Sequence, residues 1–242
     1  MVERASQLPT EPFTAERTWE VEGIPVLSAT VSLPEPVPAA DRVSRRIRRY
    51  YRLQCRAFLR YCEHWLLPQA EIEYHAALAA STPMPQFQAA LGYQITYDDA
   101  GIWSLYTQSR EVTLPGQTLL QRHGDTWDLR TGYPAALSDF FPRRSGWRKR
   151  LLAFAEADIQ RQEAAGTARY RDGWRRELRR RFDPMNFYLS AQGLVFFYPM
   201  YAIAPAIEGI PTFTVPLDAC GIQWSVPHAG PDGQEEGPPN TP

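Results

Sequence analysis

The stretch QFQAALGYQITY, residues 86–97, decides the fold class because its side chains alternate between apolar and mostly polar. A repeat of two is typical of a strand with one buried face. The hairpin loop Asp98-Asp99-Ala100-Gly101 follows, and Gly101 can adopt the left-handed backbone that such a loop needs. We therefore expect residues 102–114 to return as an antiparallel strand. The apolar positions of the first strand are Phe87, Ala89, Leu91, Tyr93, Ile95 and Tyr97.

Upstream of this hairpin, the sequence predicts two strands and a long helix. Residues 18–21 and 26–33 alternate weakly, and prolines at positions 34, 36 and 38 are expected to end the sheet. Asp41 is a good N-cap for the helix, and Pro68 is expected to end or kink it. A second helical piece is expected over residues 69–80.

Downstream of the hairpin, short strands alternate with helices. This order predicts an α+β protein with antiparallel sheets, a long helix in the N-terminal half and two helices in the C-terminal half. The expected elements are a strand at 126–129, an apolar turn at 137–141, helices at 145–162 and 172–181, a hairpin of 186–189 with 194–198, and a strand at 210–215.

The domain organisation follows from the changes in composition. We expect a flexible arm over residues 1–16, an α+β sub-domain over 17–133 and a second one over 134–222. Residues 223–242, which include GPDGQEEGPPNTP, cannot supply a core and are expected to be disordered.

Bulk composition is that of a soluble globular protein, with 44% hydrophobic residues and a formal net charge of −1 over 242 residues. No apolar run approaches the roughly 18 residues of a membrane helix, so no membrane segment is expected. The N-terminus has no secretory signal pattern. Together with an odd number of cysteines, this favours a cytoplasmic protein with three buried free thiols, which are Cys55, Cys62 and Cys220.

Two segments resemble a known family. WDLRTGYPAALSDFF, residues 127–141, and NFYLSAQGLVFFYPMYAIAPAIEGIPTFTVPL, residues 186–217, resemble conserved segments of the DUF3298 family. The upstream helix and hairpin resemble the DUF4163, or PdaC-like, domain. The resemblance implies an extracytoplasmic, non-enzymatic module that binds or senses a protein or cell-envelope ligand. Such domains occur in RsiV-like anti-sigma factors, which sense lysozyme, and beside the catalytic domain of some peptidoglycan deacetylases.

The proline-rich segment after the last hairpin is the candidate ligand-binding surface. Prolines limit its backbone freedom, and a stiff loop loses less entropy on binding. The alternative is that its apolar side chains close the open end of the sheet. The candidate ligand-binding residues are Tyr198, Tyr201, Ile203, Pro205, Ile207 and Glu208.

Catalytic, metal and cofactor sites are not predicted. His64, Glu71 and His75 would share one face of an unbroken helix, but Pro68 lies between them and the HExxH spacing is missing. The sequence His123-Gly124-Asp125 could orient a histidine, but no GxSxG elbow supplies a nucleophile, and a surface loop is favoured. A small hydrolase with an unlocated site remains an alternative function.

Arginines form a stripe over residues 45–60 and a cluster over 169–181. Nucleic-acid-binding proteins combine such stripes with net positive charge, so the balance of −1 argues against nucleic acid. Solvated helix faces are the favoured interpretation. A cytoplasmic regulator that binds an acidic partner through these faces is the other alternative function.

Overall fold

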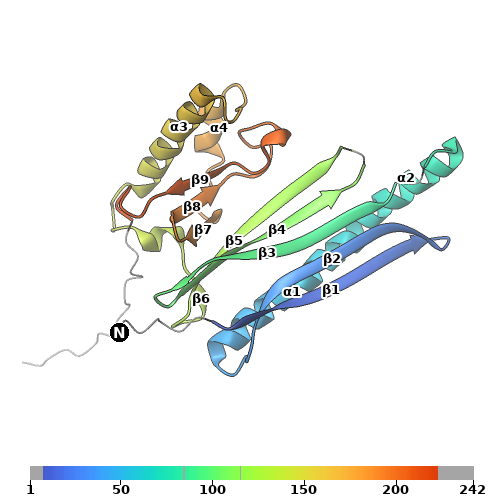
Figure 1. Ribbon diagram of the computed structural model, residues 1–242, viewed down its shortest axis with the longest axis horizontal. Coiled ribbons are helices and arrows are strands. Elements are labelled where there is room, and N and C mark those ends of the chain that lie inside the picture. The colour runs from blue at the N-terminus through green and yellow to red at the C-terminus, as the bar shows by residue number, and fades with distance from the viewer. Residues whose placement is uncertain (1–7, 84, 115, 223–242) are drawn as a thin grey trace, which may run out of the picture.

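The computed structural model describes residues 8–83, 85–114 and 116–222 and arranges them in two sheets with helices (Figure 1). A six-stranded sheet has the order β1-β2-β3-β4-β5-β6, and a three-stranded sheet has the order β7-β8-β9. All neighbouring strands are antiparallel except β2 and β3. The predicted α+β class is thus confirmed, with one parallel pair that the long helical connection between β2 and β3 permits.

The strands are β1 (Thr10–Val21), β2 (Ile24–Pro36), β3 (Phe87–Asp99), β4 (Ile102–Val112), β5 (Thr118–Asp128), β6 (Tyr133–Pro134), β7 (Phe187–Ser190), β8 (Gly193–Phe197) and β9 (Thr212–Val215). The helices are α1 (Arg42–Tyr61), the π-helix η1 (Cys62–Leu66), α2 (Leu67–Ala80), α3 (Trp147–Ala165) and α4 (Trp174–Arg180). Two short 3-10 helices are η2 (Leu137–Phe140) and η3 (Ala206–Glu208).

Strand β1 corrects the prediction of a flexible arm over residues 1–16. It begins at Thr10, and β2 continues through Pro34 to Pro36. The Val37 N–H donates to the carbonyl oxygen of Pro9, so residues 9 and 37 form a hydrogen-bonded pair. Hydrogen-bonded and non-hydrogen-bonded pairs alternate along an antiparallel ladder, and Pro12 with Pro34 is a non-hydrogen-bonded pair. The missing N–H of proline therefore costs no ladder hydrogen bond there. Residues 1–7 and the predicted tail at 223–242 lie outside the described residues.

The long helix begins where Asp41 caps it. The Asp41 carboxylate accepts from the backbone N–H groups of Val43 and Ser44 at 2.7 and 2.9 Å. Pro68 does not end the helix. It follows the π-helix η1, in which the Leu67 N–H bonds to Cys62 five residues back. This wider turn makes room for the proline ring, so the helix continues to Ala80.

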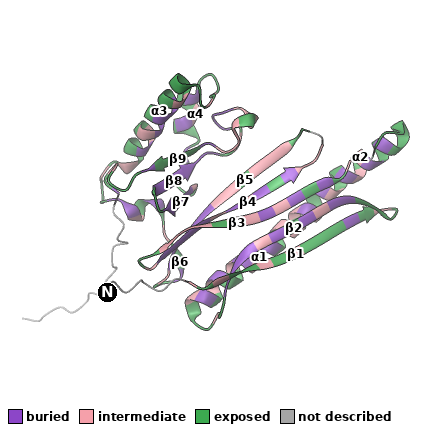
Figure 2. Ribbon diagram, viewed as in Figure 1, coloured by how far each residue is buried: buried purple, intermediate pink, exposed green. Residues whose placement is uncertain are grey.

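The core of the N-terminal half lies between α1 and the six-stranded sheet (Figure 2). Ile47, Tyr51 and Cys55 recur every four residues and face the sheet, as one side of an α-helix requires. Beneath them, Trp103 and Trp127 are buried, and the Trp127 indole donates to the Tyr51 hydroxyl at 3.1 Å. This packing fixes the position of α1 over β4 and β5.

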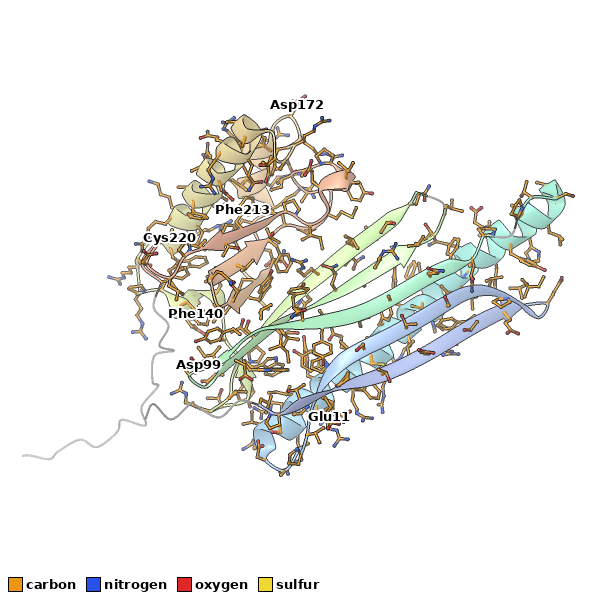
Figure 3. The ribbon with its side chains drawn as sticks, viewed as in Figure 1. Glu11, Asp99, Phe140, Asp172, Phe213 and Cys220 are labelled. Atoms are coloured by element: carbon orange, nitrogen blue, oxygen red, sulfur yellow. The ribbon has the colours of Figure 1, made fainter. Side chains whose placement is uncertain are left out.

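The C-terminal half packs α3 against the three-stranded sheet. Apolar side chains from both layers form its core, among them Phe140 and Phe213, which are labelled in Figure 3. Strand β7 contacts the face of β4 and β5 that is turned away from α1. The Leu189 N–H donates to Ser104 Oγ at 2.8 Å. A Cβ at Gly124 would lie 1.9 Å from the carbonyl oxygen of Phe187, so this approach requires glycine.

No helix in the described part of the chain combines the length and the apolar character needed to cross a membrane.

Candidate functional site

Two adjoining hollows lie on the side of β4 and β5 that faces the long helix. The first has a volume of about 410 Å³ and lies between α1 and the two strands. The second has a volume of about 420 Å³ and extends past η1 to the loop that carries Tyr201. Tyr61 and Glu111 line both hollows, so we treat them as one surface, the α1–β5 groove.

A buried carboxyl group lies at the middle of the groove. Glu111 is only 4% exposed, and the Tyr61 hydroxyl donates to its Oε2 at 3.0 Å. Burial raises the pKa of the Glu111 carboxyl above its ordinary value. Burial and the nearby Glu111 also raise the pKa of Cys62 to about 12, so this thiol is unreactive.

Hydrogen-bonding groups line the first hollow. Thr107, Ser109 and Glu111 occupy alternate positions of β4, so all three side chains face the helix. Gln54 donates through Nε2 to Thr107 Oγ1 at 2.9 Å. Its Oε1 is shielded from solvent and has no hydrogen-bond partner among the described residues. The groove wall is therefore rich in acceptors and hydroxyls, with one acceptor unsatisfied.

His123 lies on β5 at the end of the groove, not on a surface loop as predicted, because β5 is longer than the predicted strand at 126–129. Its Nε2 is 3.3 Å from Asp125 Oδ1 and 3.3 Å from the Tyr50 hydroxyl. Asp125 is buried and also accepts from Tyr50 and Tyr51 at 3.0 and 3.1 Å. The hydrogen bond with Asp125 raises the pKa of His123 above its ordinary value.

This histidine has an orienting carboxylate but no attacking group beside it. Among the described residues, His123 hydrogen bonds with no serine or cysteine. Burial also raises the thiol pKa of Cys55 and Cys220, and Cys220 is half-buried instead of buried as predicted. The described residues therefore do not form a nucleophile–histidine–carboxylate triad.

The residues considered for a metal site do not come together. His64 and His75 are exposed on the helix, and the ring of His75 packs against that of Tyr74. Among the described residues, no group of three metal-ligating side chains could hold an ion.

The six candidate ligand-binding residues are divided between the core and the surface. Tyr198 and Ile203 are 1% and 0% exposed, so neither side chain is accessible to a ligand in this structure. The Tyr198 hydroxyl donates to the carbonyl oxygen of Leu178 at 2.7 Å, which anchors the end of β8 to α4. The alternative interpretation placed Tyr201, Ile203 and Ile207 at the open end of the sheet; of these, only Ile203 packs in the core.

The remaining loop residues lie at or near the surface. Tyr201 is 43% and Ile207 is 90% exposed, and Tyr201 lines the end of the groove. Pro205 is half-buried. Glu208 is half-buried and accepts from the backbone N–H of Arg169 at 3.0 Å, which holds the loop against the segment before α4. Of the six residues, only Tyr201 is part of the groove.

The loop that carries Tyr201 lies in the part of the chain that matches a known protein family. The family model described as "Protein of unknown function (DUF3298)" matches residues 138–218. These residues form a DUF3298 domain. It contains α3, α4 and the three-stranded sheet, whereas the groove is built mainly by the elements before it.

Solved structures of DUF3298 proteins share the fold of nearly the whole chain. One from Bacteroides fragilis has a TM-score of 0.64 and 16% identity, and the match covers 88% of this chain and 92% of that one. One from Pseudomonas aeruginosa has a TM-score of 0.57 and 16% identity, with 90% and 94% covered. No curated protein matches the chain. The shared fold therefore includes the groove-forming half as well as the DUF3298 domain.

Sequence reasoning missed Gln54, Tyr61, Thr107 and Glu111. They are separated by up to 57 positions in the numbering (54 to 111), and only the packing of α1 on the sheet brings them together. One signal was present. One face of β4 begins with the apolar residues Trp103 and Leu105. The same face then continues with polar side chains, which are Thr107, Ser109 and Glu111. Polar residues on an otherwise buried face indicate a site.

Proposed function

We propose that this protein is a non-enzymatic binding or sensing module for a protein or cell-envelope ligand, and that the α1–β5 groove receives the ligand. The observation that carries the proposal is a concave surface with a buried carboxyl group at Glu111 and an unsatisfied acceptor at Gln54. Concave sites with a few convergent polar groups are the usual form of ligand pockets.

The chemistry of the groove favours a narrow ligand that donates hydrogen bonds. Glu111, Gln54 and the hydroxyls of β4 can accept from hydroxyl or amide groups. Tyr61 and Tyr201 add flat surfaces with polar tips, as is common for residues that anchor ligands. A glycan strand or an extended peptide has this combination of width and donors.

The likeness of the N-terminal half to a DUF4163, or PdaC-like, domain supports an envelope ligand. In that arrangement the chain corresponds to the binding part of RsiV-like sensors and of peptidoglycan deacetylases. The groove then lies mainly in the DUF4163-like part, and Tyr201 of the DUF3298 domain closes one end.

Binding can be tested with soluble peptidoglycan fragments and, separately, with lysozyme, using isothermal titration calorimetry. We expect Gln54→Ala and Tyr201→Ala to weaken binding about tenfold, the effect of losing one hydrogen bond or contact of about 1.4 kcal/mol. Ile207→Ala is the matched control because Ile207 is exposed in the same loop but outside the groove. Weaker binding by Ile207→Ala alone would place the ligand on the loop and not in the groove.

A small hydrolase is the second candidate because Asp125 orients His123 beside the groove. A histidine of this kind could activate water as a general base. Release of reducing ends or free amines from peptidoglycan fragments, lost in His123→Ala, would favour the hydrolase over the binding module.

A further inference from the structure

A separate hollow of about 760 Å³ lies between the start of α3 and the end of α4, within the DUF3298 domain. Four cationic side chains line it: Arg144, Arg148, Lys149 and Arg179. Trp147, Leu152 and Ala153 contribute apolar surface between them. The hollow shares no lining residue with the α1–β5 groove, so its chemistry is independent of the function proposed above.

The charges at the start of α3 oppose the stability of the helix. A helix N-terminus carries partial positive charge and is stabilised by acidic side chains. The first turn of α3 has no acidic residue, and Arg148, Lys149 and Arg150 follow directly on its first residue. Arg150 donates to the carbonyl oxygen of Ser145 at 2.7 Å, but the helix dipole still disfavours three cations here. An unfavourable local pattern of this kind is expected where function requires it.

Few of these charges are neutralised within the protein. Glu156 pairs with Arg175 at 3.2 Å and with Arg179 at 3.4 Å. In the described ranges, Arg144, Arg148 and Lys149 form no ion pair, although Arg148 lies over the ring of Phe182. An anion in the hollow would therefore meet cations that are not already paired.

Uncharged donors are available at the same place. Gly146 is the N-cap of α3 and has no side chain to cap the first turn. Ser145 lines the hollow, and its Oγ is shielded from solvent and has no hydrogen-bond partner among the described residues. Guanidinium, ammonium, hydroxyl and helix N-terminal N–H groups are the set of donors that proteins use for phosphate.

We propose that this hollow binds the phosphate of an ester whose alcohol part is apolar. The phosphate lies among Arg148, Lys149 and the start of α3, and the apolar part lies on Leu152 and Trp147. A soluble phosphate ester and a membrane phospholipid share this chemistry.

Octyl phosphate is the probe, compared with inorganic phosphate and with uncharged octyl glucoside by isothermal titration calorimetry. We expect saturable one-to-one binding of octyl phosphate, weaker binding of phosphate and none of octyl glucoside. The double variant Arg148→Gln/Lys149→Gln should lose at least about tenfold in affinity, since hydrogen bonds with charged groups are stronger than those between neutral groups. Arg49→Gln/Arg56→Gln is the matched control because both arginines are exposed on α1.

The unfolding temperature separates a binding role from a structural one. Removing two cations from the start of a helix relieves an unfavourable interaction, and the loss of the Arg148 contact with Phe182 offsets it, so the double variant should unfold at about the same temperature. Equal octyl phosphate affinity in the two double variants, or no binding by the wild type, would overturn the proposal.

Vesicles of phosphatidylglycerol and phosphatidylcholine identify the source of the ligand. If the Arg148→Gln/Lys149→Gln variant loses binding both to octyl phosphate and to phosphatidylglycerol vesicles, the ligand is a phospholipid. If only octyl phosphate binding is lost, it is a soluble ester. Vesicle binding without saturable octyl phosphate binding would show a charged surface and no phosphate site, and would also overturn the proposal.

Discussion

The Tyr61 hydroxyl donates a 3.0 Å hydrogen bond to Glu111 at the point where the two hollows of the α1–β5 groove meet. A side chain of the long helix thus holds a carboxyl group that the sheet has buried. Burying a carboxyl group with one hydrogen bond costs stability when the group is charged. The buried Glu111 carboxylate therefore lowers the stability of the free protein, and a ligand that donates a hydrogen bond to it can offset this loss.

Glu111→Gln should make the protein more stable at neutral pH. The pKa of Glu111 is raised in the folded protein, so its favourable contribution is complete below the ordinary value of 4.5 and is lost as the pH rises through the raised value. Urea unfolding at pH 8 should show a higher free energy of unfolding for the variant, with the difference vanishing near pH 4. Glu16→Gln, at an exposed position, should show no such pH dependence; a less stable Glu111→Gln protein at pH 8 would contradict the burial argument.

The pKa of His123 should be set mainly by Asp125. The hydrogen bond with Asp125 raises it above 6.5, and the charge of Asp183 adds a smaller effect. An NMR titration should therefore show a larger fall in the His123 pKa for Asp125→Asn than for Asp183→Asn. The stabilising contribution of charged His123 is complete below pH 6.5 and is lost as the pH rises through the raised pKa. An unchanged pKa in Asp125→Asn would contradict this geometry.

Gly124→Ala should strongly destabilise the contact between the two sheets. The added Cβ would lie 1.9 Å from the carbonyl oxygen of Phe187, which is backbone and cannot rotate away. We expect a loss of about 3 kcal/mol in the free energy of unfolding, at the upper end for overpacked sites. Gly92→Ala is the control because a Cβ added there would have no atom within 4 Å beyond its chain neighbours, and it should change stability by less than about 0.5 kcal/mol. Similar losses in both variants would be inconsistent with close packing at Gly124.

Tyr198→Phe should affect stability and not binding. The change removes the buried hydrogen bond to Leu178 and should cost about 1 kcal/mol of unfolding free energy. Tyr201→Phe, at the exposed position in the same loop, should leave stability unchanged. Thermal unfolding and titration with peptidoglycan fragments measure the two properties; weaker binding by Tyr198→Phe at full stability would restore Tyr198 as a ligand contact.

The sequence predicted the elements whose signals are local. The alternation in residues 86–97 corresponds to β3, where Phe87, Ala89 and Leu91 are buried. Asp41 caps α1 as expected, because a cap depends on residues only two and three positions away. The beginning of β1 at Thr10 was missed, since its polar, proline-containing segment becomes a strand through pairing with β2.

The candidate site could be predicted only in part. Of the residues proposed as ligand contacts in the loop after β8, Tyr201 and Ile207 are exposed, but the apolar composition of the loop did not distinguish them from the buried Tyr198 and Ile203. Local composition cannot show on which side of a stiff loop the sheet lies. The groove depends on contacts between residues far apart in the chain, which periodicity does not report.

The central claim is that the ligand lies in the α1–β5 groove, and NMR mapping with soluble peptidoglycan fragments tests it most directly. The NMR signals of the Gln54 side-chain amide and of the Thr107 and Glu111 backbone amides should shift on titration. In Tyr201→Ala the same signals should need about tenfold more ligand to shift, in line with its weaker binding. Shifts confined to Ile207 and its neighbours, with Gln54 unmoved, would contradict the account.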